Sequence, residues 1–218
     1  MYRAPADILA TLETRDPAVF RHSRQVAIHA TAIARRLELP AAEVVRIRRA
    51  ALLHDIGKTL IPKAILGKSG PLTEAEFAIV KQHPETGARL VERLGDPELT
   101  LIVRHHHEHL DGSGYPDGLK GAEIPLGARV VAVADTFDAV TSERPYRAAM
   151  GPHEALELLA AVAGSQLDPR VVRAFRRTYS AGPALPSGDR RPATRPAAQA
   201  LRTPGGPSTA RPIRSAPG

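Results

Sequence analysis

Apolar residues in the first part of the chain recur at intervals of three and four positions, which is the spacing of an amphipathic helix. The Asp-Pro pair at residues 16–17 is a helix N-terminal signal, and the pattern that follows predicts a helix of roughly 22 residues that ends just before Pro40. A second helix begins at Pro40 and stops at Gly57. We expect the C-terminal end of this helix to place His54 and Asp55 side by side.

Capping signals predict further helices downstream. Thr73 and Glu76 form a capping box, and the helix that they begin must end near His83, because the residue before a proline is disfavoured in a helix. The apolar run over residues 126–141 suits a buried strand as well as a buried helix, and we predict a helix because the chain offers no second strand candidate. The other predicted helices cover residues 85–94, a segment that starts at 96–97, 152–163 and 168–179.

These elements predict an all-α fold. Residues 1–15 are expected to form a lead-in helix, and residues 16–180 a single domain. Residues 181–218 consist mainly of Pro, Gly, Ser, Thr, Ala and Arg. This segment has too few large apolar residues to offset the entropy lost on ordering, so we predict a disordered tail.

The distribution of charge weakens the case for a nucleic-acid partner. The net charge is +7, but the predicted tail carries six arginines and one aspartate, which leaves only +2 for the preceding residues. The chain contains no cysteine, which excludes disulfides and thiolate metal sites and fits a cytoplasmic protein. No run of apolar residues is long enough for membrane insertion.

Histidines and carboxylates gather at helix ends and beside Pro or Gly, where several side chains can be aimed into one cavity. Residues 104–116 alone hold four histidines and two acids. A carboxylate beside an imidazole suits a two-metal site in which Asp55 bridges the ions. The candidate ligands are His22, His54, Asp55, His83, His106, His107 and Asp135.

Each of these residues also has a simpler interpretation. His22 alone is more often an exposed or hydrogen-bonded histidine than a ligand, and the histidine run is equally a solvated, metal-scavenging patch. Asp135 suits a helix N-cap or a partner for a buried arginine, and Glu108 and Asp111 suit loop-capping acids. Two histidines have no comparable context and are interpreted as structural: His29 and His153.

The order of the motifs resembles the HD-GYP family, a branch of the HD-domain metal-dependent phosphohydrolases. The resemblance covers roughly residues 16–179. Its main motifs are Leu-His-Asp-Ile-Gly-Lys at 53–58, His-His-Glu at 106–108, Asp-Gly-Ser-Gly-Tyr-Pro at 111–116, and Arg-Pro-Tyr-Arg at 144–147.

The resemblance implies an all-helical HD-domain bundle of about seven helices around a binuclear metal centre, usually of iron or manganese. Family members hydrolyse cyclic di-GMP to the linear dinucleotide or to GMP, through attack by a hydroxide that bridges the two metals. Carried over by motif, one metal would be held by His22, His54, Asp55 and Asp135, and Asp55 would bridge to a second metal held by His83, His106 and His107. His105 and His109 are positions that the motif does not specify, and we interpret them as bystanders.

The family pattern also implies roles around the metals. Lys58 would neutralise the phosphate under attack, and Asp138 would orient the site or a water. The substrate-binding positions would be Gly114, Tyr115, Arg144 and Arg147, with the tyrosine ring beside the guanine.

Departures from the family pattern and one alternative function bear on the prediction. Family members with a third metal carry a glutamate where this chain has Ala18, so we predict two metals. Members often carry an upstream sensory domain, so the chain is expected to be a stand-alone enzyme or a separated fragment. The alternative function is a regulatory module that binds diguanylate cyclases or other partners through the loop at 111–116.

Overall fold

The computed structural model of the protein describes residue 10 and residues 13–14, 16–143 and 148–180. Three sequence predictions fall on the remaining residues and therefore lie outside the description. They are most of the lead-in helix at 1–15, the substrate contacts Arg144 and Arg147, and the tail at 181–218.

The all-α prediction is confirmed. The described residues contain eight helices of seven residues or more and no strand, only one isolated bridge between Ala163 and Leu167. The eight helices are α2 (Pro17–Arg36), α3 (Ala41–Leu53), α5 (Glu74–Val80), α6 (His83–Val91), α7 (Pro97–His105), α8 (Leu126–Thr141), α9 (Pro152–Ala161) and α10 (Pro169–Ser180), and a single helical turn, α4 (Lys63–Leu66), lies between α3 and α5. Three short 3-10 helices join them: η1 (Ile56–Leu60), η2 (Glu92–Leu94) and η3 (Gly121–Glu123).

Several helix ends follow the predicted capping chemistry. The side chain of Asp16 accepts the N–H of Val19 at the start of α2, and Asp96 caps α7 in the same way. The capping box of Thr73 and Glu76 at the start of α5 is present with both of its hydrogen bonds.

Two helix boundaries and one short helix depart from the sequence prediction. α3 ends at Leu53 rather than at Gly57, because the chain tightens into η1 there. α6 begins at His83 rather than after Pro84, since a proline in the first turn of a helix has no hydrogen bond to lose. The short helix α4 lies in a segment for which the sequence predicts no helix.

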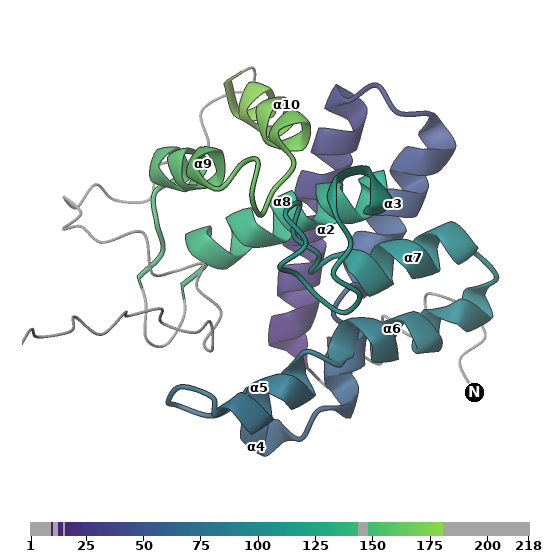
Figure 1. Ribbon diagram of the computed structural model, residues 1–218, viewed down its shortest axis with the longest axis vertical. Helices are drawn as coiled ribbons and strands as arrows, with labels where there is room; N and C mark the ends of the chain where they lie inside the picture. Colours follow the sequence, from purple (N-terminus) through teal and green to yellow (C-terminus); the bar gives the residue numbers. More distant parts are fainter. Residues whose placement is uncertain (1–9, 11–12, 15, 144–147, 181–218) are drawn as a thin grey trace, which may run out of the picture.

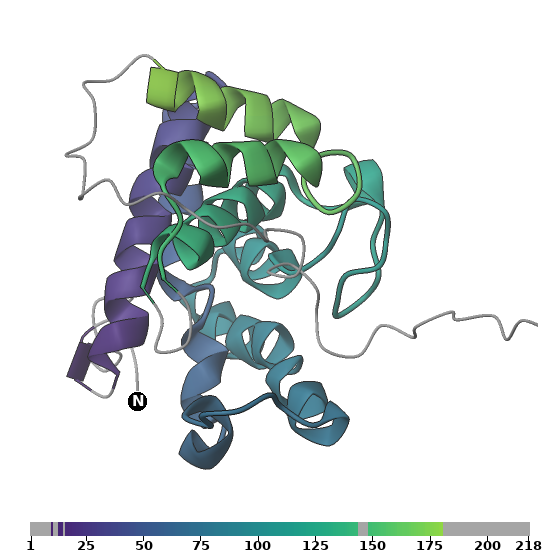
Figure 2. The same ribbon diagram turned by 90° about the vertical axis from the view of Figure 1, so that its left-hand side faces the viewer.

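α2 is the central support of the fold and packs against α3, α8 and α10. Figures 1 and 2 show α9 and α10 together at one end of the molecule and α4 and α5 at the other. α8 is buried on most of its surface, including Val130, Val131 and Val133. This all-round burial explains why its sequence reads equally well as a buried strand.

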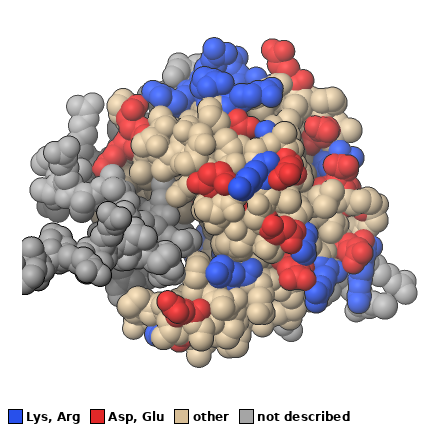
Figure 3. Space-filling view, viewed as in Figure 1, with Lys and Arg blue, Asp and Glu red and all other residues tan. Residues whose placement is uncertain are grey.

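Charge on the outer surface is uneven even without the tail. α10 carries four arginines and no acid, and Figure 3 shows Lys and Arg gathered toward the end of the molecule where α10 lies. Within the described residues, no helix has an apolar stretch long enough to cross a bilayer.

Candidate metal centre

Helix ends and the faces of two helices bring the seven predicted ligands together beside a cavity of about 760 Å³. His22 lies in the second turn of α2, Asp135 lies in the middle of α8, and Asp55 lies in the junction between α3 and η1. His54 is the C-cap residue of α3, His83 is the first residue of α6, and His106 and His107 follow the end of α7. A residue beyond a helix terminus is free of the helical 100° step, so neighbours such as His54 and Asp55 can face one centre.

Three of these histidines are oriented by the same local device. Nδ1 of His54, His83 and His106 lies 2.7 Å from the carbonyl oxygen three residues earlier, and a ring that donates this bond turns Nε2 toward the centre. Each of these Nε2 atoms is buried and has no hydrogen-bond partner. Such an unsatisfied buried atom is costly, and three of them at one centre are explained by bound cations.

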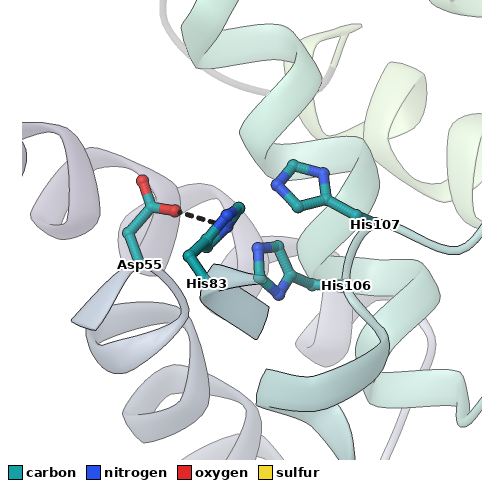
Figure 4. A group of neighbouring side chains, drawn as sticks. All are labelled: Asp55, His83, His106 and His107. Atoms are coloured by element: carbon teal, nitrogen blue, oxygen red, sulfur yellow. Dashed lines mark ion pairs between the residues drawn. The ribbon is translucent and has the colours of Figure 1, made fainter. Parts of the chain in front are cut away.

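The ligand atoms divide into two groups that share Asp55. One group joins Asp55 to His83, His106 and His107 (Figure 4), and the other joins Asp55 to His22 and His54. Nε2 of His83 lies 3.2 Å from Oδ1 of Asp55. The arrangement of donors matches a centre in which one carboxylate reaches two ions, and mixed imidazole and carboxylate donors suit divalent transition metals.

Asp135 completes the second group from α8. Its Oδ1 lies 3.1 Å from Nε2 of His22 and 3.9 Å from Nε2 of His54. Because Asp135 lies inside α8, it is not a helix N-cap, and no arginine in the described part of the chain forms an ion pair with it. All seven residues therefore fit a binuclear centre by position and by donor type, and the role of each as a ligand stays a prediction.

The site holds its carboxylates ionised and most of its imidazoles neutral. Burial opposes the charged form of Asp55, but Lys58 and the neighbouring histidines outweigh it and hold the pKa of Asp55 well below its usual value. The pKa of Asp135 is lowered in the same way, against burial, by its contact with His22. Burial lowers the pKa of His106, and it lowers that of His107 to about 3. Deprotonated ligands are the forms that bind cations.

His22 is the exception among the candidate ligands. Its burial would lower the pKa, but contacts with Asp135 and Asp138 outweigh that effect and raise the pKa of His22 to about 10. Nδ1 of His22 lies 2.6 Å from Oδ2 of Asp138. A metal ligand of this kind would keep Nδ1–H on Asp138 and give up the proton on Nε2.

We therefore expect metal binding at the His22 group to release one proton. Below pH 10 the affinity should rise with pH, by up to about tenfold per pH unit, because the cation competes with a proton on His22. His106 and His107 add no slope there, since burial keeps both rings neutral. Calorimetry in buffers of different protonation enthalpy counts the released protons.

The Asp138→Asn variant is the control for this proton linkage. It removes one of the charges that raise the pKa of His22, so the slope of affinity against pH should shrink. An affinity that does not change with pH in the wild type, with no proton released, would contradict the assignment of His22.

Lys58 is placed to act in the cavity. Its Nζ lies 2.6 Å from Oδ2 of Asp55, and its side chain is 27% exposed. Lys58 therefore lies at the rim of the proposed centre, within reach of a group bound there. Asp138 contacts Nδ1 of His22 and is placed to orient that ring, and its predicted role stays a prediction.

The loop at 111–116 folds back over the end of α7. The Tyr115 ring stacks on His107 with centroids 4.9 Å apart, and the ring is not among the residues that line the cavity. A side chain at Gly114 would overlap the backbone of Glu108 and His109, which explains the glycine. The proposed contact between Tyr115 and a base stays a prediction.

Sequence reasoning left the roles of two acids open, and the structure favours the loop-capping interpretation for both. Glu108 accepts the backbone N–H groups of Asp117 and Leu119, and Asp111 accepts that of Ser113. Nδ1 of His105 lies 3.7 Å from Oε1 of Glu108 and 3.6 Å from Oδ2 of Asp117. We assign no ion to this group because Arg104 already neutralises Asp117 through two hydrogen bonds, a contact that sequence reasoning missed.

The two histidines interpreted as structural lie away from the centre. His29 packs edge-on against Phe137 and Phe175 and lies beside Tyr179 in an aromatic cluster under α10. His153 lies in the first turn of α9. Neither residue belongs to a metal-capable group within the described part of the chain.

Comparison with known proteins defines the class. The family model described as HD domain matches residues 7–171. A cyclic di-GMP phosphodiesterase of Pseudomonas aeruginosa is 44% identical over 171 residues, which cover 77% of this chain and 41% of that protein. A 3′3′-cGAMP-specific phosphodiesterase of Vibrio cholerae is 39% identical over 170 residues, which cover 78% of this chain and 37% of that protein.

A solved structure shares the fold. The chain superposes on an HDG"Y"P protein from Bdellovibrio bacteriovorus with a TM-score of 0.63 and 21% identity, over 80% of this chain and 57% of that one. The protein belongs to the HD-domain family, and its resemblance to the HD-GYP branch is confirmed. It spans less than half the length of the two curated relatives described above.

Proposed function

We propose that this chain is a metal-dependent phosphodiesterase that hydrolyses cyclic di-GMP to the linear dinucleotide or to GMP. The observation that carries the proposal is the position of Asp55 between two groups of inward-facing histidines. The names of the relatives support a cyclic dinucleotide as the substrate class, and they include both cyclic di-GMP and cyclic GMP-AMP enzymes.

Two divalent ions, iron or manganese, are the proposed cofactors. When bound, they supply a nucleophile derived from water at neutral pH and compensate the charge of the phosphate. Asp55 would be a ligand of both ions, and His107 would be a ligand of the ion that His83 and His106 also hold. The remaining ligands would be His22, His54 and Asp135 for one ion and His83 and His106 for the other.

Residues around the centre would bind and orient the substrate. Lys58 would exchange its contact with Asp55 for the phosphate under attack, which suits a compact cation at the rim of the cavity. Asp138 would keep the ring of His22 in the orientation that exposes Nε2. Further substrate contacts are proposed for Gly114, Tyr115, Arg144 and Arg147.

The proposed catalytic unit is residues 16–180, acting in the cytoplasm on a small-molecule substrate. A role as a binding module for diguanylate cyclases is the alternative, and it needs no metal. A requirement for bound metal therefore distinguishes the proposed enzyme from the binding module.

The test is incubation of the purified full chain with cyclic di-GMP under anaerobic conditions, after loading with ferrous iron or manganese. We expect linear dinucleotide or GMP as product, and no product after the metal is removed by a chelator. Parallel reactions with 3′3′-cGAMP rank the two substrates. Absence of turnover of any cyclic dinucleotide by metal-loaded protein would refute the proposal.

A further inference from the structure

His107 differs from the other four histidines at the centre in how its ring is held. His54, His83 and His106 each place Nδ1 against a backbone carbonyl oxygen, and His22 places Nδ1 against Asp138. The ring nitrogens of His107 form no hydrogen bond with any residue that the structure describes. A ligand ring without such a partner has no polar contact to fix its rotation.

Ring contacts take the place of that hydrogen bond. Tyr115 stacks on His107 with an interplanar angle of 26° and a centroid distance of 4.9 Å. His107 also contacts the ring of His106, with centroids 4.2 Å apart, and that of His83 in an edge-to-face pair with centroids 4.9 Å apart. The Tyr115 hydroxyl forms no hydrogen bond with a described residue, so the face of the ring, and not the hydroxyl, makes this contact.

The loop that carries Tyr115 is fixed to the segment that carries His107. The backbone N–H of Tyr115 donates to the carbonyl oxygen of His107 at 3.2 Å. Glu108 is buried, and its two carboxylate oxygens accept the N–H groups of Asp117 at 2.8 Å and Leu119 at 3.2 Å. These bonds cross the loop just beyond Tyr115, so the backbone that carries the stacked ring cannot move away without breaking them.

The burial of Glu108 also indicates that the loop is anchored to the segment that carries His107. A buried carboxylate is costly unless it is paired or well hydrogen-bonded. Nδ1 of His105 lies 3.7 Å from Glu108, beyond hydrogen-bond distance, and no Lys or Arg among the described residues forms an ion pair with this carboxylate. Its two bonds to the loop backbone therefore account for its presence in that position. The anchored loop holds an aromatic face against one wall of the metal centre.

We infer that Tyr115 is a positioning residue for His107, which it holds by stacking in the orientation needed to bind a metal. This inference rests on the two-metal centre of the proposed function. Loss of a group that orients a ligand lowers metal affinity by roughly 10–100-fold. Removal of the Tyr115 ring should therefore weaken one of the two metal sites by about that factor and leave the other site unchanged.

The experiment measures manganese binding to the full chain without substrate, by paramagnetic resonance or by competition with a chelator. Tyr115→Phe keeps the stacked ring and should match the wild type. Tyr115→Leu and Tyr115→Ala should each show the weakened site. Ser113→Ala is the matched control, because Ser113 is exposed in the same loop and makes no ring contact with His107.

The outcomes separate this inference from the proposed function. Two sites of unchanged affinity in folded Tyr115→Leu and Tyr115→Ala would overturn the inference, and a raised KM in those variants would instead assign Tyr115 to the substrate. Should Tyr115→Ala fail to fold in a thermal unfolding control, Tyr115→Leu and Tyr115→Phe decide the question. A wild type that binds neither manganese nor ferrous iron would refute the two-metal centre itself.

Discussion

Replacement of Asp55 by asparagine is expected to leave the chain with a single bound metal and to lower turnover of cyclic di-GMP by roughly 10³-fold or more. Asp55 is the one residue shared by both groups of ligands, and the asparagine keeps its shape but not its charge. Removal of a single electrostatic contact to a transition state already costs about 10²–10³-fold in rate. Loss of an ion that compensates charge should cost more.

Metal analysis and turnover are measured on the same Asp55→Asn sample. Glu157→Gln is the control, since it also removes one negative charge but from an exposed pair with Arg176 on the surface. It should retain both metals and full activity. An Asp55→Asn variant that keeps two metals and its activity would show that Asp55 does not bridge them.

The second large expected effect is a loss of folding stability when Gly57 is replaced. A Cβ atom at this position would overlap the carbonyl oxygen of His83 and lie 2.7 Å from the backbone nitrogen of Gly87. These are backbone atoms of α6 and cannot rotate away, so α6 must shift and take His83 with it. We expect Gly57→Ala to lower the free energy of unfolding by about 3 kcal/mol, at the upper end of overpacking costs.

Chemical denaturation of metal-free protein measures this loss without any contribution from bound ions. The control is Gly70→Ala, because no atom lies within 4 Å of a Cβ at that exposed position. Its free energy of unfolding should change by less than about 1 kcal/mol. Equal stabilities of the two variants would mean that the contact between η1 and α6 is looser than the structure shows.

Local signals in the sequence predict most of the helices. Asp-Pro pairs and a capping box act over three or four residues, and the starts of α2, α5 and α7 follow them. The bounds of α8 agree with its apolar run at 126–141, although the choice of helix over strand depended on the rest of the chain. The change from α3 to η1 has no comparable signal, because it depends on the contact with α6.

The candidate ligands are predictable for a different reason. Metal chemistry restricts a cysteine-free site to His, Asp and Glu, and the spacing of those residues at helix ends marks the segments that meet. The supporting contacts are not predictable in this way. Glu108 bonds to residues nine and eleven positions later, and Gly57 is required by a backbone far along the chain, so both depend on the folded path.

The most direct test of the account is a titration of metal-free protein with manganese or ferrous iron, in which bound metal and turnover of cyclic di-GMP are followed together. A centre shared through Asp55 predicts that turnover remains low after the first equivalent and rises with the second. Full turnover with one bound ion, or with none, would contradict a binuclear centre.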